Sequence, residues 1–214
     1  MFEAVLFDLD GTLTDTLTDI ANAMNRALAM HGLPQWPVEA YKYLVGNGAK
    51  TLSERCVRDR MELAPSVRRE YQAYYQDHAL IATKPYDGIP ELLEALAQRG
   101  MKLTVLSNKP DADTKNVVAH FFPDVPWTLV RGQVEGVPVK PDPTGAFRLA
   151  REIGVTPEKI LYLGDTSVDM CCAAAAGMHP VGVLWGFRTE KELRDSGAAF
   201  VAASPADVLR YLDM

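Results

Sequence analysis

Two aspartates near the amino terminus have the type and spacing of a paired-carboxylate site. Asp8 and Asp10 follow an apolar run, and Gly11 comes directly after them. Residues two apart on a strand share a face, so both carboxylates should project together where the chain leaves the strand. Two neighbouring carboxylates are unfavourable unless a cation or a shared proton compensates them. Taken alone, the pair could equally be a loop cap and a surface acid.

Three further polar clusters accompany later apolar runs. They are Ser107-Asn108-Lys109, Lys140-Pro141, and Gly164-Asp165 with Asp169. Ligands of open parallel sheets bind at the carboxyl ends of the strands, so these groups are expected to converge on the first pair. Each cluster alone has an ordinary explanation as a turn, a surface charge or a helix cap. Their joint occurrence indicates one site.

The charge balance of this site points to a metal. Four aspartates (Asp8, Asp10, Asp165 and Asp169) face a single nearby cation, Lys140. Such a site would repel an anionic substrate unless a divalent cation were bound. Oxygen ligands suit Mg²⁺ better than zinc, so the sequence predicts Mg²⁺ as the cofactor.

The elements that must position these residues are short apolar runs alternating with helical patterns. The runs span residues 4–7, 103–106, 127–130, 160–163, 181–184 and 198–201. Their near-continuous apolarity is typical of parallel strands that are covered on both faces. The pattern predicts an α/β fold, a doubly wound, Rossmann-like parallel sheet.

One connection is much longer than a parallel crossover needs. Residues 14–84 show helical periodicity, and we interpret them as an inserted, all-helical cap domain on a core of residues 1–13 and 85–214. The alternative is a single domain with long surface helices. Tyr71, Tyr74 and Tyr75 fall at helical spacing, which favours core packing over an aromatic binding site.

Composition limits the remaining function classes. The chain has 214 residues and a net charge of −6, which argues against a nucleic-acid or anionic-membrane surface. It lacks a signal-peptide pattern and a long apolar run, so a cytoplasmic protein is expected. The three cysteines suit neither a disulfide framework nor a zinc site. A monomer and a homodimer both remain open.

The four polar clusters, in this order and spacing, resemble the sequence motifs of the haloacid dehalogenase superfamily of phosphatases. The insert resembles the helical cap that this superfamily carries in its C1 position. Residues 45–49, followed by Leu52 and Glu54-Arg55, are similar to the cap signature of its bacterial phosphoglycolate phosphatases.

The resemblance implies a Mg²⁺-dependent phosphomonoester hydrolase for a small phosphorylated metabolite, with 2-phosphoglycolate as the expected substrate. It implies that Asp8 is the nucleophile that becomes an aspartyl-phosphate and that Asp10 is the general acid and base. The metal would be held by Asp8, the Asp10 carbonyl and Asp165, with Asp169 supporting the metal waters or Lys140. The groups expected to bind phosphate are Gly11, Thr12, Ser107, Asn108 and Lys140.

Two alternative functions stay open at this point, together with a prediction about the cap. A mutase of the β-phosphoglucomutase type shares these motifs, and a phosphate-binding regulatory module would be non-catalytic. Within the cap, Gly46-Asn47-Gly48 is expected to enter the site, with Asn47 and Lys50 recognising the non-phosphate end of the substrate. A helix-start turn with a solvated Lys50 explains the same segment.

Overall fold

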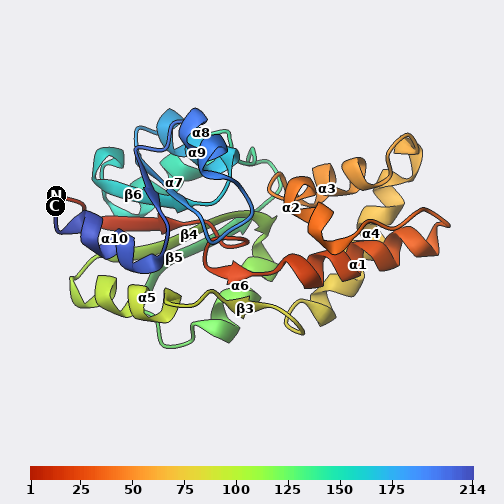
Figure 1. The fold of residues 1–214 in the computed structure, drawn as a ribbon, viewed down its shortest axis with the longest axis horizontal. Coiled ribbons are helices and arrows are strands. Elements are labelled where there is room, and N and C mark those ends of the chain that lie inside the picture. The colour runs from red at the N-terminus through yellow and green to blue at the C-terminus, as the bar shows by residue number, and fades with distance from the viewer.

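The computed structural model describes residues 1–214, and its centre is a six-stranded parallel sheet between two helical layers (Figure 1). The strand order is β5-β4-β1-β6-β7-β8. The strands are β1 (Ala4–Phe7), β4 (Lys102–Pro110), β5 (Trp127–Gln133), β6 (Ile160–Gly164), β7 (His179–Val183) and β8 (Phe200–Ala202). The expected doubly wound α/β sheet is therefore confirmed.

The two faces of the sheet bury alternate residues of each strand. On β1, Val5 and Phe7 join one apolar cluster while Ala4 and Leu6 join the other. The first cluster is covered by α5 (Ile89–Gln98), α6 (Asp111–Phe121) and α10 (Pro205–Leu212). The second is covered by α7 (Thr144–Ile153) and α8 (Ser167–Ala175), and α9 (Glu190–Asp195) packs against β7. Because both faces are buried, the strands read as continuous apolar runs.

One strand differs from the prediction in a way that matters for the site. Strand β4 continues to Pro110 and pairs with Gln133 of β5 after an irregularity in register. Ser107, Asn108 and Lys109 therefore lie on extended, buried backbone rather than in a loop after the strand.

The segment between β1 and α5 holds the cap helices, seen at one end of the sheet in Figure 1. They are α1 (Leu17–Met30), α2 (Tyr41–Leu44), α3 (Gly48–Cys56) and α4 (Ala64–His78), with short 3₁₀ turns at Val38–Ala40 and Met61–Leu63. Tyr71 and Tyr75 are buried in the apolar cluster of these helices. A third short 3₁₀ turn, Pro157–Lys159, precedes β6 in the core.

The two ends of this segment pair with each other, so residues 14–84 are not wholly helical. Strands β2 (Thr14–Asp15) and β3 (Lys84–Pro85) form an antiparallel ribbon between the sheet and the cap helices. The exact boundary between core and cap stays a prediction. No helix is both long and apolar enough to span a membrane.

Next to this ribbon, Asp19 anchors the chain that leaves α4. Its carboxylate is buried and accepts hydrogen bonds from the backbone N–H groups of Ile81, Ala82 and Thr83, the last at 2.8 Å. The Thr83 hydroxyl donates a further bond at 2.8 Å. One side chain thus satisfies three consecutive amide groups that no regular element pairs.

We predict that Asp19→Ala lowers the free energy of unfolding by about 3 kcal/mol, because the segment loses a charged acceptor and the buried N–H and hydroxyl of Thr83 lose their partner. Urea denaturation followed by circular dichroism measures this change. The matched control is Asp77→Ala, on an exposed position of α4, which should change stability by less than about 0.5 kcal/mol. Equal effects of the two substitutions would show that the Asp19 carboxylate does not hold this segment.

Candidate active site

Three neighbouring strands bring the predicted site residues to one edge of the sheet. Strand β1 lies between β4 and β6. Asp8 follows β1, Ser107 lies near the end of β4, and Asp165 follows β6, and all three are buried. The convergence expected at the carboxyl ends of the strands is therefore what the sheet order produces.

Lys140 binds two of the buried carboxylates. Its Nζ lies 2.8 Å from Asp8 Oδ1 and 2.7 Å from Asp169 Oδ1, and it also donates to the Leu106 carbonyl at 3.0 Å. These three bonds use all the donors of one ammonium group. The lysine comes from the loop between β5 and α7, and it links that loop to β1 and α8.

Asp169 positions Lys140. Its second oxygen, Oδ2, accepts hydrogen bonds from the Thr166 hydroxyl at 2.7 Å and the Thr166 N–H at 3.2 Å, which completes a capping box at the start of α8. Because both oxygens already have partners, this carboxylate is suited to holding the lysine rather than to binding a metal directly.

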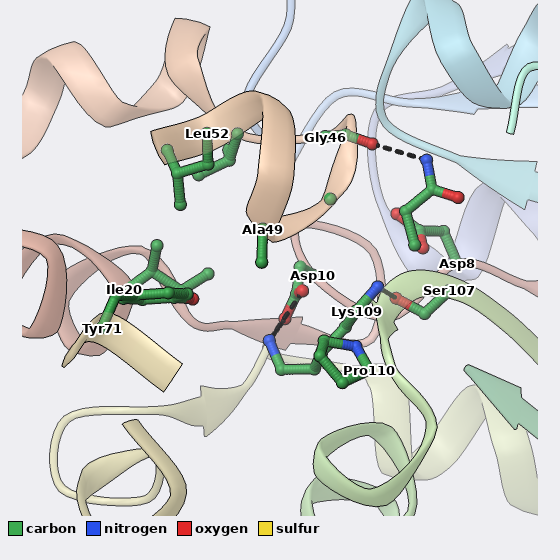
Figure 2. A pocket seen from close by; sticks show the side chains of 13 residues that line it. Asp8, Asp10, Ile20, Gly46, Ala49, Leu52, Tyr71, Ser107, Lys109 and Pro110 are labelled. Carbon is green, nitrogen blue, oxygen red and sulfur yellow. Dashed lines mark hydrogen bonds and ion pairs between the residues drawn. The ribbon is translucent and has the colours of Figure 1, made fainter. Parts of the chain in front are cut away.

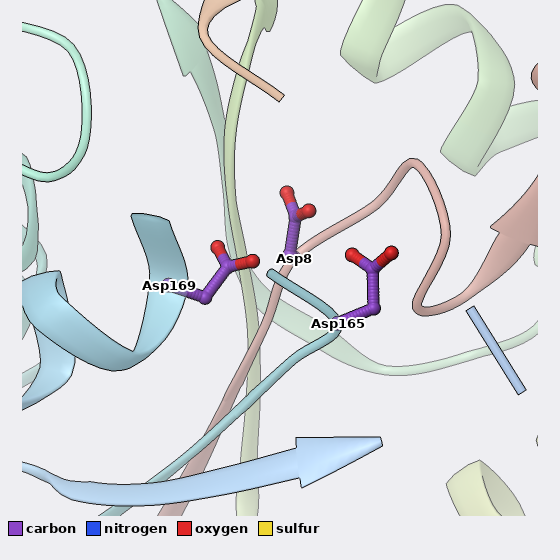
Figure 3. A group of neighbouring side chains, drawn as sticks. All are labelled: Asp8, Asp165 and Asp169. Carbon is purple, nitrogen blue, oxygen red and sulfur yellow. The ribbon is translucent and has the colours of Figure 1, made fainter. Parts of the chain in front are cut away.

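Asp8 and Asp165 retain the oxygens that a metal would need. Carboxylate oxygens of Asp8, Asp165 and Asp169 lie within 4.8 Å of one another, and Figure 3 shows the three groups projecting from separate segments toward one space. Asp165 Oδ2 accepts the Phe187 N–H at 2.8 Å, whereas its Oδ1 is buried without a hydrogen-bond partner. A buried carboxylate oxygen with no donor is costly unless a cation completes it, so these residues fit a divalent cation.

The electrostatics of the site lead to the same conclusion. Burial raises the pKa of Asp8 to about 7, although the Lys140 ammonium opposes this shift, and the Asp169 charge adds to it. Burial, with the charges of Asp169 and Asp8, also raises the pKa of Asp165 well above its ordinary value. A further positive charge at this site would therefore stabilise the ionised forms of both acids.

A pocket separates this cluster from the cap (Figure 2). The core contributes Asp8, Asp10, Ser107, Asn108, Lys109 and Pro110, and the cap contributes Ile20, Val45, Gly46, Gly48, Ala49, Leu52 and Tyr71. The segment from Gly46 to Gly48 therefore reaches the site, as expected. The cap side of the pocket is almost entirely apolar.

The structure places Asn47 and Lys50 outside the pocket walls, contrary to their expected role. The Asn47 side-chain oxygen Oδ1 accepts a hydrogen bond from Arg55 at 2.8 Å. Lys50 is 74% exposed and pairs with Glu54 one turn along α3. Both side chains belong to the start of that helix, which is the alternative that the sequence left open.

Asn108 was expected to bind phosphate, but its side chain is fully engaged with backbone. Its Nδ2 donates to the carbonyls of Gly46 and Lys140, each at 2.9 Å, and its Oδ1 accepts the Lys140 N–H at 2.8 Å. Asn108 therefore positions Lys140 and joins the cap loop to the core. Its bond to the Gly46 carbonyl is the dashed line that leaves Gly46 in Figure 2.

Gly11 and Thr12 shape the turn after β1 and do not present free amides. Their N–H groups donate to the carbonyls of Thr14 and Leu9. Gly11 has a φ of +90°, and a Cβ there would collide with the Asp165 carboxylate. Glycine is thus required for the close approach of the turn to Asp165.

Lys109 was not given a role by the sequence, yet it pairs with Asp10. Its buried Nζ lies 2.7 and 2.8 Å from the two Asp10 oxygens and 4.8 Å from the centre of the Tyr75 ring. The signal was present, since the four predicted acids faced one cation while Lys109 followed Ser107-Asn108 directly.

Comparison with known proteins agrees with this geometry. Residues 5–183 match the family model described as haloacid dehalogenase-like hydrolase. The chain belongs to this family.

Several proteins that resemble this chain over nearly its whole length are named as phosphatases. The chain is 33% identical to a phosphoglycolate phosphatase of Aquifex aeolicus, over 98% of this chain and 96% of that protein. The chain is also 30% identical to the N-acetylmuramic acid 6-phosphate phosphatase of Pseudomonas aeruginosa, over 99% of this chain and 95% of that protein. The crystal structure of a predicted phosphoglycolate phosphatase from Haemophilus somnus superposes with a TM-score of 0.91 at 29% identity, covering 99% of this chain and 98% of that one.

In this hydrolase, the loop after β7 connects the candidate metal ligand to the cap. The Phe187 N–H donates to Asp165, while the Phe187 side chain packs in the apolar cluster of the cap. The Arg188 guanidinium donates to the cap carbonyls of Lys42 and Val45, the latter at 3.2 Å. Adjacent residues thus contact the metal site and hold the cap.

We predict that Arg188→Ala loosens the docked cap, because two cap carbonyls lose a charged donor. Amide hydrogen exchange of residues 42–46 should accelerate about tenfold, as the loss of one to two such bonds implies. Mass spectrometry of peptides covering this segment measures the rate. Arg194→Ala, which removes an exposed ion pair with Glu190, is the control and should leave the segment unchanged. Unchanged exchange in Arg188→Ala would contradict the role given to this side chain.

Proposed function

We propose that the protein is a Mg²⁺-dependent phosphomonoesterase that works through an aspartyl-phosphate on Asp8. The observation that carries this proposal is the buried arrangement of Asp8, Lys140 and Asp165 beneath a pocket closed by the cap. The family match and the phosphatase names of the relatives support it.

The first step transfers the phosphoryl group from the substrate to the enzyme. An Asp8 carboxylate oxygen attacks phosphorus, the bond from phosphorus to the ester oxygen breaks, and Asp10 gives that oxygen a proton. Asp10 lies in the same pocket wall, so it can reach a leaving group on the cap side of Asp8. The products are the free alcohol and a phosphorylated Asp8.

The second step returns the phosphoryl group to water. The ionised Asp10 takes a proton from the water molecule that attacks phosphorus, and the bond to the Asp8 oxygen breaks. The Ser107 hydroxyl, which is buried and lines the pocket, is available to a phosphoryl oxygen. Lys140 already contacts Asp8, so it can stabilise charge as the phosphoryl group arrives.

Asp8, Asp165 and the backbone carbonyl of Asp10 would hold Mg²⁺. The bound ion would supply positive charge to the phosphoryl oxygens and to the two acids whose pKa values burial raises. The chain's own contribution is to keep the Asp165 oxygen aimed into the site through the Phe187 N–H.

Pocket size and the relatives favour a small substrate, and we propose 2-phosphoglycolate. The pocket has a volume of about 50 Å³, and one enclosed water needs roughly 10–15 Å³ on this measure. A two-carbon acid suits this space better than a sugar ring, so N-acetylmuramic acid 6-phosphate is the second candidate.

The cytoplasmic location and the oligomeric state stay predictions.

The test is phosphate release by the purified protein with Mg²⁺. Wild type should hydrolyse 2-phosphoglycolate with a higher kcat/KM than N-acetylmuramic acid 6-phosphate or a hexose phosphate. Asp8→Asn should lower kcat by at least about 10⁴-fold, because an amide cannot act as the nucleophile. Its melting temperature, measured alongside, should show a folded protein.

Three other outcomes would contradict this function. A strict requirement for a sugar bisphosphate would favour the mutase, and no turnover on any phosphate ester would favour a regulatory module. Wild-type rates in Asp8→Asn would remove Asp8 from the mechanism.

We also predict that Mg²⁺ affinity rises at least about tenfold between pH 6 and pH 8. The pKa of Asp8 in the metal-free site is about 7, so Mg²⁺ must displace a proton at the lower pH but not at the higher one. Calorimetry in two buffers of different ionisation enthalpy measures both the affinity and the protons released.

Asp165→Asn is the matched control for this titration, because it should abolish Mg²⁺ binding while leaving Asp8 in place. Affinity that does not change between pH 6 and pH 8 would show that these carboxylates do not hold the ion.

A further inference from the structure

Lys109 has one ammonium donor that the fold leaves without an acceptor. Its side chain is only 4% exposed, and its Nζ has hydrogen bonds to the two Asp10 oxygens alone. Burial lowers the pKa of this group, but the charges of Asp10 and its other neighbours outweigh burial and raise it overall, so the group is a cation. Figure 2 shows it at the pocket wall, with its nitrogen joined to Asp10 by a dashed line.

The other cations around the pocket are already engaged. Lys140 uses its three donors on Asp8, Asp169 and the Leu106 carbonyl. Arg55 binds the Leu44 carbonyl and Asn47, and Arg188 binds cap carbonyls. Lys109 is therefore the one cation among the pocket-lining residues that can meet a second negative group on a substrate.

The position of Lys109 specifies where that group would be. Its Nζ lies within 2.8 Å of both Asp10 oxygens, and Asp10 is the group that would contact the leaving oxygen. A carboxylate on the carbon that bears this oxygen falls within reach of the same ammonium. A carboxylate one or more methylenes farther away would lie against the apolar cap wall, where no donor offsets its desolvation.

We propose that Lys109 binds the substrate carboxylate and selects O-phosphorylated 2-hydroxy acids, in which ester oxygen and carboxylate share one carbon. The inference rests on the proposed phosphatase function and adds the residue and the substrate class that it selects. Asp10 holds the lysine in place from one side, and the substrate occupies its remaining donor. Ile20 and Leu52 line the same pocket with apolar groups, and an ion pair is stronger in such poorly solvated surroundings than in water.

Three substrates separate this role from a general effect on turnover. They are 2-phosphoglycolate, 2-hydroxyethyl phosphate, which has the same length without the charge, and 3-phosphooxypropanoate, whose carboxylate is one methylene farther from the ester oxygen. Wild type should prefer the first over each of the others by about 10–100-fold in kcat/KM, the range expected for one hydrogen bond between charged groups.

Lys109→Met should remove this preference. It should lower kcat/KM for 2-phosphoglycolate about 10–100-fold more than for 2-hydroxyethyl phosphate, mainly through KM, and Lys109→Arg should restore part of the difference. Lys50→Met, which removes an exposed lysine of the cap, is the control and should leave all three values unchanged. Inhibition by inorganic phosphate checks that the phosphoryl site of each variant is intact.

If Lys109→Met is inactive because Asp10 is no longer held in place, a binding measurement still tests the proposal. Calorimetry with 2-phosphoglycolate on an Asp8→Asn background should show weaker binding when Lys109→Met is added. Equal losses on all substrates, or unchanged binding, would overturn the role of Lys109.

The wild-type data alone distinguish the two levels of the proposal. Comparable hydrolysis of 2-phosphoglycolate and 2-hydroxyethyl phosphate would overturn the carboxylate contact and leave the phosphatase standing. Hydrolysis of no phosphate ester would overturn the proposed function and this inference together.

Discussion

The ion pairs of Lys140 with Asp8 and Asp169 are the interaction on which the rest of the site depends. Burying an ammonium group and two carboxylates costs several kcal/mol per ion unless the geometry is good and the remaining donors have partners. Here the third donor binds the Leu106 carbonyl, and Asp169 is itself held by the capping box of α8. Removing Lys140 would leave two buried acids unpaired, so the sheet edge, α8 and the β5–α7 loop are linked through one side chain.

The same network extends into the cap. Asn108 holds both the backbone of Lys140 and the carbonyl of Gly46, and the loop that supports Asp165 also carries the arginine that binds the cap. A shift of the cap would therefore disturb the groups that position the candidate nucleophile and metal ligand. This arrangement suits an enzyme that must exclude water while the phosphoryl group is transferred.

The sequence was sufficient for the features that depend on local pattern. Alternating apolar runs and helices predict the parallel sheet, and polar residues at strand ends predict the convergence of Asp8, Ser107 and Asp165. The sequence was insufficient wherever the direction of a side chain determines its role. Lys50 and Lys109 both lie close in sequence to residues expected in the site, yet the first turns to solvent on α3 while the second is held inward by the extension of β4 and by Asp10. From the sequence, Asn108 is expected to bind phosphate, and only the structure shows that backbone groups occupy its side chain.

The most direct test of the account is to trap the intermediate on Asp8. The protein would be mixed with 2-phosphoglycolate and Mg²⁺, quenched in acid during turnover, digested and analysed by mass spectrometry. The account predicts a peptide that carries one additional phosphoryl group on Asp8 and that is absent from Asp8→Asn. Rapid turnover with no phosphorylated Asp8 at any quench time, or a phosphoryl group on another residue, would contradict it.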